Sequence, residues 1–131
     1  NLFGILPGTC YGWPKNELHW RGIENSIIDI ALTRTPELAI VDGIIGMEGD
    51  GPLNGTPKHL GVVVMGTDLV AVDATCCRLM GLDPRRVPYL VLAQQKQLGR
   101  LHESEIPQLG ESIAAKASPF ELPPKIERML A

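Results

Sequence analysis

The sequence predicts an α/β fold in which a small mixed sheet is layered against helices. Two short apolar runs, residues 38–45 and residues 61–66, are bounded by turn residues, as strands are. Two further stretches, residues 17–33 and residues 69–80, have apolar residues at helical spacing. The chain has 131 residues, of which 44% are hydrophobic, so it is large enough for one domain with its own core.

The first sixteen residues contain three glycines and two prolines, which predicts a short strand or extended arm followed by a loop. Asn16 is a suitable N-cap for the helix over residues 17–33, and Pro36 marks its end. The apolar stripe of this helix consists of Leu18, Ile23, Ile27, Ile30 and Ala31.

The runs over residues 38–45 and 61–66 are almost continuously apolar, which is typical of strands buried on both faces. Residues 46–60 lie between them and show no periodicity, which predicts a fifteen-residue loop. Because this connection contains no helix, the two strands need not be parallel. Their order in the sheet stays open.

The second half of the chain has clear helix signals. Asp68 is placed to cap a helix over residues 69–80, and Gly81 to end it. Asp83 followed by Pro84 favours another helix start, and Gly99 ends the segment after it.

The remaining residues predict less structure. Pro107 limits residues 105–109 to a short edge strand. Residues 118–131 predict an extended crossover and a last helical turn.

Composition excludes several classes of protein. The net charge is −3 and the pI is near 5.6, which argues against nucleic-acid binding because that needs a basic face. No apolar run approaches the ~20 residues of a membrane span. The chain begins at Asn1 without an initiator methionine, so we expect it to be a piece of a longer protein.

The three cysteines are Cys10, Cys76 and Cys77, and none forms a CxxC pair. Neither a zinc site nor an iron–sulfur site is therefore indicated by spacing. Adjacent cysteines within an apolar helix are typical of small buried hydrophobic residues, and we expect no structural disulfide.

The segment GMEGDGPLNGTP, residues 46–57, is the strongest candidate for a site. Gly49, Gly51 and Gly55 allow positive φ angles and a close approach of backbone to ligand. Glu48 and Asp50 supply the oxygen ligands that Mg²⁺ or Ca²⁺ prefer. The alternative is a solvated loop with acidic tips.

Asp42 interrupts an apolar strand near its C-terminal end, where α/β sheets place their ligands. A buried carboxylate needs a partner. We therefore predict Asp42, Glu48 and Asp50 as ligands of a divalent cation. The alternative for Asp42 is a hydrogen bond from neighbouring turn N–H groups.

Asp68 and Asp73 are predicted as buried carboxylates at the start of the second helix and inside it. Five residues correspond to about 140° of rotation, so the two do not share a face. Asp68 is explained as an N-cap. Asp73 needs a partner, for which Arg78 and Lys15 are candidates.

Lys15 and His19 are four residues apart and lie between Trp13 and Trp20. They favour a cationic, aromatic-lined pocket for a small anionic or oxygen-rich ligand. The alternative is a surface lysine and a histidine that is satisfied locally. No nucleophile arrangement or P-loop can be assembled from the sequence, so the catalytic residues stay unknown.

Taken together, the segments NLFG, LPG, PELAIVDGIIGMEGDGPLNGTP, MGTDLVAVDATCCRLMGLDP and LGR are similar to the family called domain of unknown function 362. The similarity runs from the first residues to about Gly110. It marks Lys15, His19, Asp42 and Glu48, together with Gly49, Gly51, Pro52, Gly55, Asp68 and Asp73.

Many members of that family carry a ferredoxin-like pair of four-iron four-sulfur clusters elsewhere in the chain, and some bacterial members have a twin-arginine export leader. The resemblance thus implies a ferredoxin-like partner or domain, but this sequence has no cluster motif of its own. It leaves localisation open between the cytoplasm and export.

Two functions follow as hypotheses. The first is a redox-linked domain whose acidic glycine-rich segment binds a ligand or a divalent cation. The second is a non-catalytic ligand-binding or docking module of an exported protein.

Overall fold

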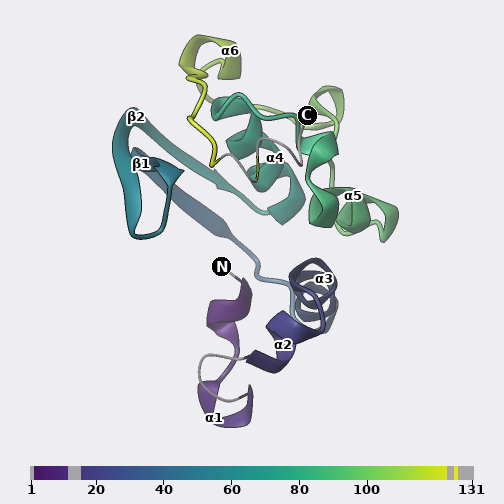
Figure 1. Cartoon of the computed structure of the whole chain (residues 1–131). Coiled ribbons are helices and arrows are strands. Elements are labelled where there is room, and N and C mark those ends of the chain that lie inside the picture. Colours follow the sequence, from purple (N-terminus) through teal and green to yellow (C-terminus); the bar gives the residue numbers. More distant parts are fainter. Residues whose placement is uncertain (1, 12–15, 124–125, 127–131) are drawn as a thin grey trace.

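The structure is a computed structural model that describes residues 2–11, 16–123 and 126. Its α/β architecture, in which helices pack against a small sheet, is as predicted; the N-terminal helices gather at one end of the molecule and the hairpin with α4 to α6 at the other (Figure 1). The elements in chain order are η1 Leu2–Ile5, α1 Gly8–Tyr11, α2 Asn16–Trp20, α3 Ile23–Thr33, β1 Ala39–Asp50, β2 Asn54–Gly66, α4 Leu69–Leu79, η2 Pro84–Arg86, α5 Pro88–Gln95, η3 Glu103–Glu105 and α6 Ile113–Lys116.

The two strands form one long antiparallel hairpin, with pairing from Ala39 opposite Gly66 to Asp50 opposite Asn54. The predicted fifteen-residue loop is therefore wrong, because only residues 51–53 lie between the strands. The glycines in this segment have no side chain, so the alternation of apolar and polar residues that indicates a strand is missing from the sequence. The Gly51–Pro52 peptide is cis.

A β-bulge divides the hairpin into a root half and a tip half. Gly43 pairs with Val62 and Ile45 with His59, so Leu60 and Gly61 together oppose the single Ile44. Gly61 has a φ of 72°, a conformation that favours glycine.

The two faces of the hairpin differ in burial. Residues such as Val41, Gly43, Val62 and Val64 are half-buried and form the inner face, whereas their neighbours along each strand are exposed. At the root, the inner face meets α4, since a Cβ on Gly66 would lie 2.9 Å from the side chain of Val72. The prediction of strands buried on both faces is wrong, because the outer face is bare in the described part of the chain.

The N-terminal third is helical, and the predicted opening strand is wrong: η1 and α1 occupy residues 2–5 and 8–11. The single helix predicted over residues 17–33 is two helices, α2 and α3. They are separated at Gly22, whose φ of 100° cannot continue a helix. α3 ends at Thr33, shortly before Pro36, as predicted.

α4 has the predicted ends. Asp68 caps its first turn by accepting a hydrogen bond from Ala71 N at 3.0 Å. Gly81, with a φ of 77°, ends it in a Schellman motif, with Leu82 N donating to Cys77 O at 2.8 Å.

The segments after α4 are shorter than predicted. Asp83 caps the single turn of η2, and α5 is a separate helix that ends at Gln95, before Gly99. The edge strand predicted over residues 105–109 is wrong, because η3 ends at Glu105 and residues 106–109 form no strand. The last predicted helical turn falls largely outside the described residues.

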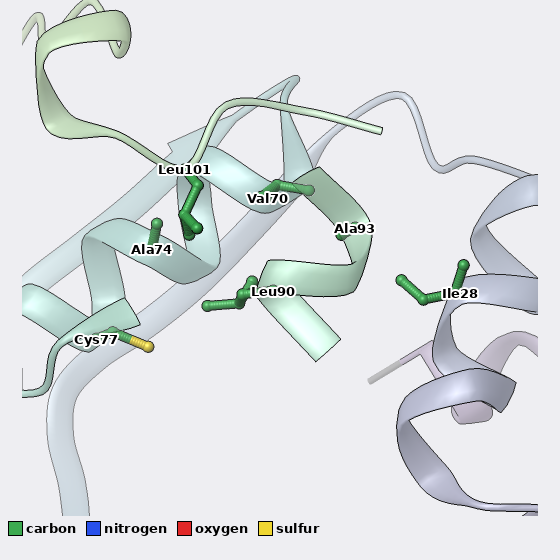
Figure 2. Close-up of a cluster of buried hydrophobic side chains, with 7 residues drawn as sticks. All are labelled: Ile28, Val70, Ala74, Cys77, Leu90, Ala93 and Leu101. Atoms are coloured by element: carbon green, nitrogen blue, oxygen red, sulfur yellow. The ribbon is translucent and has the colours of Figure 1, made fainter. Parts of the chain in front are cut away.

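The core joins the two ends of the molecule. Val70, Ala74 and Cys77 of α4 face Leu90 and Ala93 of α5, with Ile28 reaching in from α3 and Leu101 from the segment after α5 (Figure 2). Ala74, Leu90 and Leu101 are almost completely buried. Nowhere in the described chain is there a helix of the length and apolarity that a membrane crossing requires.

Candidate functional site

The tip of the hairpin is held by residues 118–122, which we call the strap. Lys58 Nζ donates to Glu48 Oε2 at 3.0 Å and to Pro119 O at 2.6 Å. Glu121 N donates to the same Glu48 oxygen at 3.0 Å, and Gly49 N donates to Glu121 O at 2.8 Å. The acidic segment thus binds another part of its own chain.

The strap also covers the end of α4. Ser118 N donates to Leu79 O at 2.8 Å and Phe120 N to Met80 O at 3.0 Å, so two carbonyls at the helix C-terminus are satisfied. The Phe120 ring lies against Gly46, where a Cβ would come within 2.8 Å of the ring. Lys58 Nζ lies 5.2 Å from the same ring's centroid, a cation–π distance.

The environment of Glu48 stabilises its charged form. Hydrogen bonds from Glu121 N and then from Lys58 lower the pKa of this carboxyl below its ordinary value of 4.5. Both side chains of the pair are about 80% covered, with 21% of Lys58 and 19% of Glu48 exposed. Glu48 is therefore already neutralised within the chain.

The glycines of the tip have local explanations. Gly49 has a φ of 77°. Cβ atoms on Gly51 or Gly55 would meet the Met47 side chain, which folds over them. Their predicted ligand-binding role stays a prediction beside these packing roles.

Asp42 and Asp50 differ from Glu48 in their surroundings, because both are exposed. Asp42 is exposed rather than buried, and its Oδ1 accepts a hydrogen bond from Ile44 N at 3.0 Å, at the bulge. This is the local alternative that the sequence left open. Asp50 is exposed at the end of β1. In the described residues no three His, Cys, Asp or Glu side chains are grouped closely enough to hold a metal ion.

Asp68 lies in a wide, largely open polar cleft of about 570 Å³. Its Oδ2 accepts a hydrogen bond from Arg100 N at 2.9 Å, and its Oδ1 accepts the one from Ala71 N. Gly99 lies directly against Asp68, because a Cβ there would overlap Oδ1. The cleft is lined by Thr67, Asp68, Gln94, Gln97, Leu98, Gly99 and Arg100.

Sequence reasoning missed Gln94, Gln97 and Arg100 as cleft residues. The signal was the segment LGR, residues 98–100, which is part of the family resemblance but had no role assigned. Gln97 has a φ of 58°, which is unusual for a residue other than glycine.

Asp73 is half-buried, and its partner is neither Arg78 nor a lysine within the described residues. Tyr89 donates its hydroxyl to Asp73 Oδ2 at 2.9 Å, joining α4 to α5. Burial, and next the charge of Asp73, raise the pKa of Tyr89. Arg78 instead donates to Leu101 O at 2.7 Å. The apolar cavity beside this pair measures about 40 Å³, which is too small for an organic ligand.

The cysteines are all free thiols: Cys77 is buried, Cys76 half-buried and Cys10 exposed. Burial, and then the charge of Asp73, raise the pKa of Cys76 and of Cys77 to about 11. Both thiols are therefore protonated at neutral pH. Cys77 is a core residue as predicted, whereas Cys76 is only half-buried.

The predicted pocket at Lys15 and His19 is only partly visible, because Lys15 and Trp13 lie outside the described residues. His19 stacks at a tilt against Phe3, with 5.1 Å between the ring centroids. Trp20 is exposed.

The outer face of the hairpin is an exposed apolar surface that the sequence did not predict. Ile40, Ile45, Met47, Val63 and Met65 each leave more than half of their surface exposed, and Leu53 at the turn is 91% exposed. An antiparallel sheet with one solvated face normally carries polar residues there. On this face of the strands the polar side chains are Asp42 and His59.

Comparison with known proteins gives two matches. The profile of the family described as a domain of unknown function, DUF362, matches residues 1–78. A thylakoid-associated protein of Synechocystis sp. is 33% identical over 101 residues, which cover 76% of this chain and 31% of that protein. The chain thus spans about a third of this relative's length. No solved structure matches the chain.

Proposed function

The chain belongs to DUF362, a family described only as a domain of unknown function, and we propose a function from its geometry. The chain is a non-catalytic docking module that binds a partner polypeptide through the outer face of the β1–β2 hairpin. The observation that carries this proposal is the row of exposed apolar side chains on that face. Large exposed apolar patches mark interaction surfaces. The hairpin packs against α4 on its inner face only, so a partner on the outer face would bury apolar surface that is exposed in the described residues.

The carboxylates support the same proposal. Glu48 is bound to Lys58 and the strap, Asp68 caps α4 and Asp73 accepts from Tyr89. Each side chain thus has a role within the fold, which leaves fewer groups for catalysis. The relative's name describes association with thylakoids. For this chain we propose association with a larger protein, and a ferredoxin-like partner stays a prediction.

The test uses the relative as the partner. In a chimera, the matching 101-residue segment of this chain replaces its counterpart in the Synechocystis protein. The substitution Val63→Lys is then introduced into both the chimera and the free chain. Val63 is 54% exposed in the free chain, so lysine should leave its melting temperature unchanged. In the chimera a covered Val63 should make the same change destabilising, by several degrees.

Leu32→Lys is the matched control, because Leu32 on α3 is 56% exposed. It should leave both proteins unchanged. Equal melting temperatures for the Val63→Lys chimera and its parent would overturn the docking proposal.

A second candidate function is the ligand or divalent-cation site of a redox-linked protein. The polar cleft at Asp68 and Arg100 favours a small oxygen-rich ligand. The cation site at Asp42, Glu48 and Asp50 stays a prediction from the sequence. Titration with Mn²⁺, followed by the broadening of NMR signals, tests the cation. Broadening around Asp42, Glu48 and Asp50 supports that site, and uniform weak broadening argues against it.

A further inference from the structure

We infer that the partner docks by strand addition: it supplies an extended, uncharged apolar segment that pairs with the open edge of β2 over residues 62–66. This inference rests on the docking function proposed above and names the occupant. The described sheet contains β1 and β2 and no third strand, so both strands have an edge without a partner strand. Backbone N–H and C=O groups along an open edge are a template for another strand.

Protective features are found on most of the hairpin. At the tip of β1 the strap accepts the N–H of Gly49. At the middle the bulge interrupts the pairing, with Asp42 accepting from Ile44 N. On β2, the tip half carries Pro57 and Lys58. Proline, lysine, bulges and covering segments are the devices that keep edges from pairing.

The root half of β2 carries neither proline nor lysine, and its pairing with β1 is regular. Residues 62–66 read Val-Val-Val-Met-Gly, with no charge, no proline and three β-branched residues in succession. The side chains of Val63 and Met65 point to the exposed outer face, next to Ile40 of β1, which pairs with Met65. A strand added here would gain backbone hydrogen bonds from the edge and specificity from alternate side chains on this face.

The occupant follows from charge and size. Because residues 62–66 are uncharged, a partner strand with a charge opposite them would lose solvation without gaining an ion pair. A lipid surface does not suit open backbone groups, which hydrocarbon cannot satisfy. The relative, by contrast, has about two thirds of its length outside the matched segment.

Hydrogen exchange measured by mass spectrometry tests strand addition on the free chain and on the chimera. Peptides covering residues 62–66 should exchange at least about tenfold more slowly in the chimera, because edge amides become hydrogen-bonded. Val63→Lys should remove this protection, and Leu32→Lys should leave it. Peptides covering η3 serve as an internal reference.

The outcomes separate this inference from the proposed function. If Val63→Lys destabilises the chimera but exchange over residues 62–66 is unchanged, a partner covers the face without pairing, and strand addition is wrong. If neither effect occurs, both proposals are wrong. The free chain should not be dimeric by light scattering with residues 62–66 already protected. That result would show that a second copy, and not a partner strand, occupies the edge, and it would overturn the inference.

A chimera that does not fold leaves a second route. The relative's remaining segments are then produced together with this chain, and exchange is measured on the co-purified material. Slower exchange over residues 62–66 supports strand addition. Failure of the two to co-purify, or exchange equal to that of the free chain, overturns it.

Discussion

Lys58 lies across the hairpin from Glu48, and its ammonium bridges that carboxylate at 3.0 Å and the strap carbonyl of Pro119 at 2.6 Å. One cation thereby joins β1, β2 and a segment sixty-one residues away. In the acidic segment that suggested a metal site, the Lys58 ammonium is therefore the cation that binds Glu48.

Protonation of Glu48 should release the strap. The pKa of Glu48 is lowered in the folded chain, so its contribution to stability is present above its ordinary value of 4.5 and is lost as the pH falls through the lowered value. The amide signal of Glu121 in NMR spectra should therefore shift in acid as its acceptor is protonated. Glu48→Gln should remove this titration, and Glu37→Gln, at an exposed site, should not.

Gly99→Ala should destabilise the fold, because its Cβ would overlap Asp68 Oδ1 and come within 2.8 Å of Val70. We expect a loss of roughly 1–3 kcal/mol in the free energy of unfolding, as for other overpacked sites. Gly110→Ala is the control, since nothing lies within 4 Å of a Cβ there. Equal stability of the two variants in urea would show that Asp68 tolerates displacement.

Gly49 and Gly51 should respond differently to alanine. Gly49 has a φ of 77°, so alanine costs roughly 1–2 kcal/mol through its backbone. A Cβ on Gly51 meets only the flexible Met47 side chain, at 2.9 Å, and should be accommodated. Thermal unfolding of both variants checks this. A loss of stability in Gly51→Ala as large as in Gly49→Ala would contradict it.

Cys76 and Cys77 should label slowly in the native chain. With each pKa at about 11, roughly one thiol in a thousand is ionised at pH 8. Exposed Cys10 should react first with a chromogenic disulfide, giving one fast equivalent of three, and all three should react in guanidinium. Fast labelling of two or more thiols in the native state would show that the α4 core opens readily.

Tyr89→Phe should destabilise the chain by about 1–2 kcal/mol, because it removes the donor to a half-buried Asp73. Adding Asp73→Asn should recover part of this loss, since an amide is less costly to leave unpaired than a carboxylate. Chemical denaturation of the single and double variants measures the coupling. Strictly additive effects would mean that the two side chains do not depend on each other.

Local chemistry accounts for what the sequence could predict. Helix caps depend on residues only a few positions away in the sequence. The expected capping roles of Asp68, Gly81 and Asp83 are all confirmed. The two apolar runs were strands because β-branched residues favour that state. Pairing across the tip was invisible, since glycines at 46, 49 and 55 carry no pattern.

The contacts that form the candidate site join segments far apart in the sequence, and the sequence alone could not predict them. Glu48 accepts from Glu121, seventy-three residues later, and nothing near either residue indicates the other. Asp73 meets Tyr89 only because α4 and α5 pack together. The cleft at Asp68 likewise forms when residues 97–100 return to the start of α4.

The strap has a consequence for the order in which the chain acquires its structure. Synthesis delivers the hairpin long before residues 118–122 leave the ribosome, and a contact spanning seventy-three residues closes late because loop closure is entropically costly. During that interval Lys58 lacks the Pro119 carbonyl, Glu48 lacks the Glu121 N–H, and the carbonyls at the end of α4 are open to water. Until then the strap does not hold the tip of the hairpin, and a partner strand present at that stage would meet the open edge of β2 before the tip is fixed.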